Sequence, residues 1–116
     1  MKKYLIDASV IASSLEDFKR RYISNPECIL ILSDLTLMEL ESCKKDRWCA
    51  VESKKFVSYL IDFFVRDTSS TEICSIESDS STKHIDKDLV KWAKEHNVSI
   101  LTCDKGMALW CRFYNV

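Results

Sequence analysis

The sequence predicts an α/β protein with three layers, α/β/α, built around a central and mainly parallel sheet. Short, continuous apolar runs such as Cys28–Leu32 alternate with amphipathic helical stretches, and such runs suit parallel strands covered on both faces. Glycine and proline occur once each, as Gly106 and Pro26, which argues against an all-β fold rich in tight turns. The 116 residues, 47% of them hydrophobic, suit one domain over 1–116.

The first half of the chain predicts two strands and three helices. In order, they are a strand at 4–6, a helix at about 9–21, a strand at 28–32, a helix at 35–45 and a helix at 50–64. Ser33 or Asp34 can cap the helix that follows the second strand, because short polar side chains accept hydrogen bonds from the first turn. The last of these helices shows apolar residues at one-turn spacing, namely Phe56, Leu60 and Phe64.

The second half predicts a polar loop followed by a helix, a strand and a short helix. The loop at 68–82 is rich in serine and threonine and contains a short strand at 73–76. A helix at 85–96 is indicated by the spacing of Ile85, Leu89, Trp92 and Ala93. A strand at 98–102 and a short helix at 107–110, with an edge segment after it, complete the α/β alternation.

Charge and cysteine content argue against a generally basic nucleic-acid-binding protein and against a disulfide-rich one. The net charge of −1 exerts no global attraction on nucleic acid, so a nucleic-acid enzyme would need a local basic patch or bound metal. The six cysteines form no CxxC and are expected to be reduced and mostly buried; a disulfide framework is the less favoured alternative. No signal-like or membrane-length apolar run occurs, so we expect a cytoplasmic protein that does not contact the membrane.

Acidic residues stand at the ends of two predicted strands and on two predicted helices. Asp7 and Asp104 follow strands, where ligands of open α/β sheets bind, although each could equally cap the next helix. Glu39 has apolar neighbours one turn away on either side, whereas Glu41 has lysines within reach at 44 and 45. An unpaired carboxylate on an apolar face is unfavourable unless something binds it, so Glu39 is the candidate.

The helix at 85–96 presents a similar choice between two acids. Asp88 precedes Lys91 by one turn and can pair with it at the surface. Asp86 precedes Leu89 and Ala93, which directs it toward the packed side, although it could simply be an acid at a helix N-terminus. Acids that converge without basic neighbours repel one another, and a hard divalent cation such as Mg²⁺, bound singly or as a pair, is the usual remedy.

Three stretches of the chain resemble the motifs of PIN-domain nucleases. YLIDASVIASSL is similar to the family's opening, in which a hydrophobic strand precedes an Asp and, two positions on, a small hydroxyl residue. LTLMELES resembles the second motif, a helix with a Glu followed by Leu. HIDKDLVKWAKEHNVSILTCDKG resembles the third and fourth, in which an Asp and an Ala seven positions on precede a strand ending in Thr-x-Asp.

The resemblance implies a PIN-like fold and a Mg²⁺- or Mn²⁺-dependent endoribonuclease that hydrolyses RNA phosphodiester bonds. It implies that metal binding and catalysis fall to Asp7, Glu39, Asp86 and Asp104, with support from Ser9, Thr102 and, as an extra acid, Asp88. It also implies RNA as substrate, favours a homodimer, and allows a VapC-like toxin held by an antitoxin. Two features depart from the family: the elements after the last motif are short, and Asn97 replaces the usual glycine before the last strand.

Basic residues near these motifs are candidates for RNA contacts. They are Lys44, Lys45 and Arg47, which lie beside Trp48, and Lys105 next to the last acid. The alternative is that they are ordinary solvated side chains. Two other functions stay open: an inactive PIN-fold module that binds RNA or protein, and a PIN nuclease acting on DNA or on structured RNA ends. A single glycine excludes a P-loop or dinucleotide-binding fingerprint.

Overall fold

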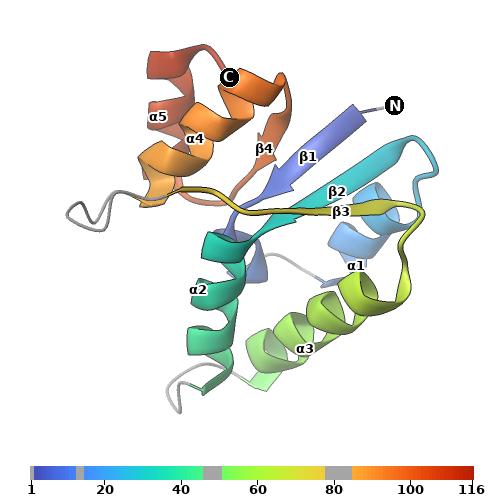
Figure 1. The fold of residues 1–116 in the computed structure, drawn as a ribbon. Coiled ribbons are helices and arrows are strands. Elements are labelled where there is room, and N and C mark those ends of the chain that lie inside the picture. The colour runs from blue at the N-terminus through green and yellow to red at the C-terminus, as the bar shows by residue number, and fades with distance from the viewer. Residues whose placement is uncertain (1, 13–14, 46–50, 78–84) are drawn as a thin grey trace.

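A computed structural model describes residues 2–12, 15–45, 51–77 and 85–116. Within these ranges, the strands form one sheet of four in the order β3-β2-β1-β4, and every neighbouring pair is parallel (Figure 1). The strands are β1 (Lys2–Ile6), β2 (Cys28–Ser33), β3 (Thr71–Cys74) and β4 (Ser99–Leu101). The predicted α/β fold with a parallel sheet is therefore confirmed.

Helices connect the strands, and most of them lie where the sequence predicts. They are α1 (Leu15–Phe18), α2 (Asp34–Lys45), α3 (Val51–Arg66), α4 (Ile85–His96) and α5 (Lys105–Tyr114), with a 3₁₀ segment η1 (Ala8–Ala12) and a π-helical segment η2 (Lys19–Ile23). The single helix expected at 9–21 is therefore wrong in detail, because 3₁₀, α and π geometry share that stretch. The expected edge segment after residue 110 is also wrong, since α5 continues to Tyr114 and ends at left-handed Asn115.

Alternating side chains of the central strands build a core on each face of the sheet. Leu5 and Ile31 are paired in register and pack against α4 and α5. Their neighbours Ile6 and Leu30 face the opposite way and pack against η1, α1 and α3. Because successive strand residues point to opposite faces, the two apolar runs need a helical layer on each side, as Figure 1 shows.

The N-terminus of α2 is tied to the end of β1. Ser33 caps α2, since its Oγ accepts a hydrogen bond from the backbone N–H of Thr36 at 3.1 Å. The buried Thr36 hydroxyl donates in turn to the carbonyl of Ile6 at 2.9 Å. This link places the next turn of α2, which carries Glu39, beside the carboxyl end of β1.

The cysteines depart in part from the expectation that they are mostly buried. Cys28 is buried and Cys74 and Cys111 are partly buried, but Cys103 is exposed; all four are free thiols. Cys49 and the side chain of Cys43 lie outside the described residues. Among the helices that the structure describes, none has the length and apolar character needed to cross a membrane.

Candidate active site

The strand order creates a crevice at the carboxyl ends of β1 and β4. The chain adds β2 and then β3 on one side of β1 and returns to place β4 on the other. Ligands of open parallel sheets bind at such a reversal of strand order. Asp7 directly follows β1, and its backbone N–H donates to the carbonyl of Leu101, the last residue of β4, at 2.9 Å. Residues 102–104, which come next, therefore lie beside Asp7.

Two hydroxyl groups hold the buried Asp7 carboxylate in a fixed orientation. Ser9 Oγ donates to Asp7 Oδ2 at 2.6 Å, and Thr102 Oγ1 donates to the same oxygen at 2.8 Å. The hydroxyls accept from the backbone: Ser9 from Cys103 N at 2.9 Å and Thr102 from Asp104 N at 3.0 Å. Each hydroxyl has one hydrogen to donate. Because the backbone N–H groups are the donors in these two bonds, that hydrogen remains available for the bond to Asp7. Ser9 and Thr102, which were expected as supporting residues, thus both contact Asp7 through its Oδ2.

Asp104 caps the next helix, as the sequence allowed, and it also lies at the crevice. Its side chain caps α5, accepting a hydrogen bond from Gly106 N at 3.0 Å through Oδ1. Asp104 also lines the pocket at the crevice. The cap uses one carboxylate oxygen, so a role in α5 does not prevent the other oxygen from contacting a ligand. Asp7, by contrast, bonds to hydroxyls through its side chain and does not act as a cap.

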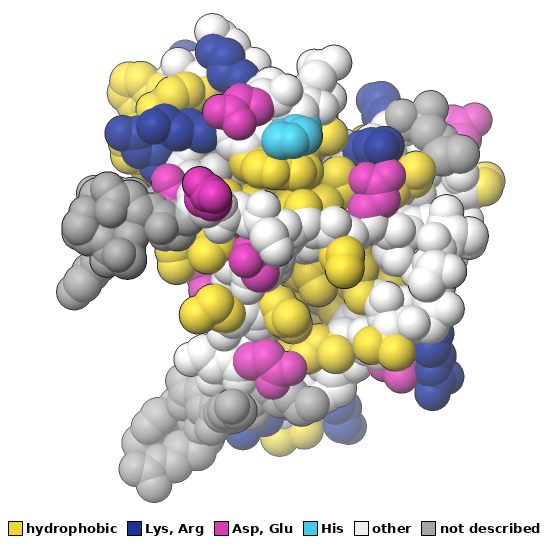
Figure 2. Space-filling model, viewed as in Figure 1, with side chains coloured by type: hydrophobic (Ala, Val, Ile, Leu, Met, Phe, Trp, Pro, Cys, Tyr) yellow, Lys and Arg dark blue, Asp and Glu magenta, His cyan; other side chains and the backbone are white. Residues whose placement is uncertain are grey.

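One open pocket brings together the four candidate acids. Its volume is about 390 Å³, and its wall consists of Asp7, Ala8, Ser9, Glu39, Asp86, Cys103 and Asp104. No described lysine, arginine or histidine lines it. On the face in Figure 2, acidic side chains lie over α4 and α2, and basic side chains lie mostly toward the edges. The carboxylates come from four separate segments of the chain, so the pocket is a concentrated negative site.

Mutual repulsion and burial perturb two of these acids. Burial raises the pKa of the Glu39 carboxyl, and the nearby Asp7 and Asp86 carboxylates raise it further. Burial likewise raises the pKa of Asp86, with added contributions from Asp7 and Asp104. Each shift means that the charged form is disfavoured in the folded protein. A bound cation would reverse this effect, because it stabilises the ionised carboxylates.

The donor chemistry of the pocket suits a hard divalent cation. Carboxylate oxygens are the ligands that Mg²⁺ and Mn²⁺ prefer, and four carboxylates face a pocket without basic lining. In the present conformation, no three Asp, Glu, His or Cys side chains of the described residues are grouped closely enough to hold one ion. A metal would therefore have to draw the acids of α2 and α4 toward Asp7.

The other predicted site residues lie elsewhere or outside the described residues. The expected surface pair of Asp88 with Lys91 is wrong, because Asp88 Oδ2 is buried and has no hydrogen-bond partner within the part of the chain described. Lys105 is exposed but does not line the pocket. Arg47, together with Trp48, lies outside the described residues, as do the side chains of Lys44 and Lys45 on α2. Sequence reasoning missed Cys103, whose position beside the last acid was the available signal.

Comparison with known proteins gives no relative from which to read the site. No protein-family model and no curated protein matches the chain. The interpretation of the pocket therefore depends on its geometry and chemistry.

Proposed function

We propose that the protein is a metal-dependent endoribonuclease of PIN type, which hydrolyses RNA phosphodiester bonds with Mg²⁺ or Mn²⁺. The observation that carries the proposal is the convergence of Asp7, Glu39, Asp86 and Asp104 on one pocket with no basic residue in its wall. Like charges that converge without a cationic partner are unfavourable, so such a pocket is better explained as a cation site than as a structural feature. The resemblance to the PIN motifs selects the same acids.

The residues divide into those that would hold the metal and those that position them. Asp7, Glu39, Asp86 and Asp104 would supply carboxylate oxygens. When bound, a divalent cation supplies Lewis-acid polarisation of a phosphate and a lowered pKa for a coordinated water. The hydroxyls of Ser9 and Thr102 keep Asp7 oriented toward the pocket. An RNA phosphate would be repelled by the acids alone, so substrate binding as well as chemistry should depend on the cation.

The test is cleavage of labelled single-stranded RNA with Mg²⁺, with Mn²⁺ and with excess EDTA. We expect cleavage only with metal, and its loss in Asp7→Asn. Glu39→Gln should also lose more than the roughly 10–100-fold that removal of an outer-shell partner costs at metal sites. Glu41→Gln is the matched control, because Glu41 lies on the same helix but does not line the pocket; it should cleave normally.

Several results would reject the proposal. Cleavage that persists in EDTA, or that is equal in Asp7→Asn and the unmodified protein, would assign the activity to something other than this pocket. Binding of RNA without cleavage would support the inactive module instead. Parallel assays on single-stranded DNA and on structured RNA ends would decide the substrate class.

A further inference from the structure

A second cavity, of about 280 Å³, adjoins the acidic pocket. It lies between η2 and the end of β4, and Cys103 forms part of the wall of both. Thr102, which also lines it, donates a hydrogen bond to Asp7 at 2.8 Å. The cavity and the proposed metal site therefore share Cys103 as a lining residue. Its volume is close to the lower limit of about 300 Å³ for ligand pockets, which suits one unit of a larger ligand.

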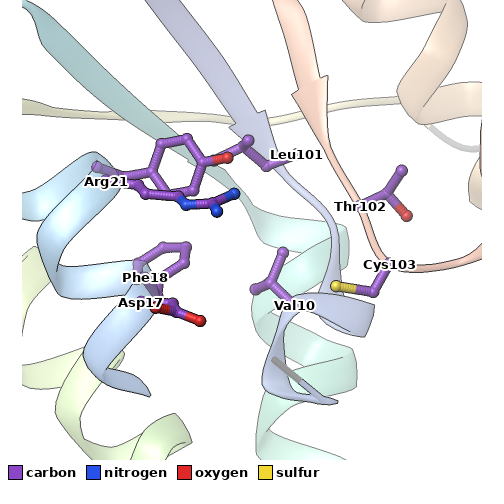
Figure 3. A pocket seen from close by; sticks show the side chains of 8 residues that line it. Val10, Asp17, Phe18, Arg21, Leu101, Thr102 and Cys103 are labelled. Atoms are coloured by element: carbon purple, nitrogen blue, oxygen red, sulfur yellow. The ribbon is translucent and has the colours of Figure 1, made fainter. Parts of the chain in front are cut away.

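Among the described residues that line this cavity, Arg21 is the one with a cationic side chain. The Asp17 carboxylate pairs with Arg20 at 2.9 Å, and within the described part of the chain Arg21 makes no ion pair. Figure 3 shows the Arg21 guanidinium extending from η2 toward the cavity. The Cys103 thiol extends toward the cavity from the other side, from the segment after β4. A planar guanidinium with free donors is suited to bidentate contact with a phosphate.

The other side of the cavity is apolar and firmly held. Phe18 is buried, and its ring packs against the rings of Tyr22 and Phe56 at 5.4 and 5.3 Å between centroids. Tyr22, which lines the cavity, also packs edge-on against Tyr4 at 5.7 Å. Rings fixed in this way offer an ordered aromatic surface. Stacking on such surfaces is the usual way in which single-stranded nucleic acid is held without sequence-specific pairing.

We propose that this cavity is a nucleotide subsite for the substrate strand, with a base against the Tyr22 side and Arg21 on a phosphate next to the one that is cleaved. The inference rests on the proposed nuclease function, because it treats the acidic pocket as the place of cleavage. It assigns RNA binding to Arg21, a cation that was not among the residues predicted to contact RNA. The two neighbouring cavities would thus hold successive parts of one strand.

The first experiment measures the affinity of a fluorescent single-stranded RNA by anisotropy, with Mg²⁺ and in an Asp7→Asn background that leaves the RNA uncut. Arg21→Ala should weaken binding about tenfold, which corresponds to about 1.4 kcal/mol, because it removes hydrogen bonds from a charged group to the phosphate. Arg21→Lys should lose less. Arg66→Ala is the control, because Arg66 is also exposed, lies on α3 and does not line the cavity; the RNA affinity of this variant should change less than about twofold.

A second experiment separates failure of this inference from failure of the nuclease proposal. In the otherwise unmodified protein, Arg21→Ala should raise the KM for RNA cleavage and change kcat little. If the unmodified protein cleaves RNA and Arg21→Ala binds and cleaves as it does, the subsite is overturned and the nuclease stands. If the unmodified protein does not cleave, the nuclease proposal fails first, and the subsite, which depends on it, is overturned too.

Discussion

At the scale of single residues, the least replaceable feature is the environment of Asp7. Asp7 is 4% exposed, and its carboxylate has no cationic partner among the described residues. Two hydroxyls, from Ser9 and Thr102, satisfy one of its oxygens. These two hydrogen bonds prevent the side chain from rotating away from the pocket.

Loss of one of these hydroxyls should impair metal use more than folding. Ser9→Ala removes the 2.6 Å hydrogen bond to Asp7 and a contact to the Cys103 backbone. We expect the Mg²⁺ concentration for half-maximal RNA cleavage to rise by about 10–100-fold, with a loss of about 1 kcal/mol in unfolding free energy. The measurement is a Mg²⁺ titration of activity together with urea denaturation. Ser58→Ala, at an exposed position of α3, should change neither; an unchanged titration for Ser9→Ala would contradict the positioning role.

At the scale of elements, local signals decide where each helix begins and ends. Ser33 caps α2, and Asp104 caps α5. Asn97 adopts φ 54° after α4, and Val98 N donates to the carbonyl of Ala93 at 3.0 Å, which closes the helix as a glycine would. Asn97 can therefore end α4 in the left-handed conformation that glycine most often provides.

Two substitutions separate the capping role of Asp104 from its proposed metal-binding role. Asparagine keeps an oxygen that can accept from Gly106 N, whereas alanine removes it. We expect Asp104→Asn to retain nearly full stability, and Asp104→Ala to lose about 1 kcal/mol, within the 0.5–2 kcal/mol typical of N-caps. Both should lose most RNA cleavage, because both remove the charge. Thermal unfolding and the cleavage assay together test this, and full activity in Asp104→Asn would show that the carboxylate serves only as a cap.

At the scale of the whole molecule, the reversal of strand order around β1 assembles the site. Helices α2 and α4 lie on opposite faces of the sheet, yet each brings one acid to the same crevice (Figure 1). The concentrated charge should destabilise the metal-free protein. This makes stability depend on pH in a direction opposite to that of an ordinary ion-paired carboxylate.

The sign follows from the raised pKa values of Glu39 and Asp86. The ordinary pKa is 4.5 for Glu39 and 3.8 for Asp86, and each is raised in the folded protein. In the pH range between each ordinary pKa and the raised one, the folded state binds more protons than the unfolded state. Stability from these groups therefore falls as pH rises through that window and stays low above it. Asp67 acts in the opposite sense, because hydrogen bonds from Ser70 lower its pKa, so the comparison must be with a variant rather than with pH alone.

We therefore expect Glu39→Gln to have a higher Tm than the unmodified protein at neutral pH in EDTA, with the difference shrinking toward about pH 4. Addition of Mg²⁺ at neutral pH should raise the Tm of the unmodified protein and reduce the difference, since a ligand of the folded state stabilises it. Glu41→Gln should follow the unmodified protein. If the difference in Tm grew on acidification, the folded protein would stabilise the ionised form of Glu39, which would contradict this prediction.

Local sequence patterns were enough to predict most of the helices and strands. They also singled out the four acids that line one pocket in the structure. The range of α4, 85–96, follows from helical periodicity, and the apolar runs of β1 and β2 follow from burial on two faces, because both signals come from neighbouring residues. The broken geometry of 8–23, the exposure of Cys103 and the cavity beside Arg21 could not be predicted in this way. The site itself depends on contacts between residues as far apart in the sequence as Asp7 and Thr102, which are 95 positions apart and which only strand order and packing bring together.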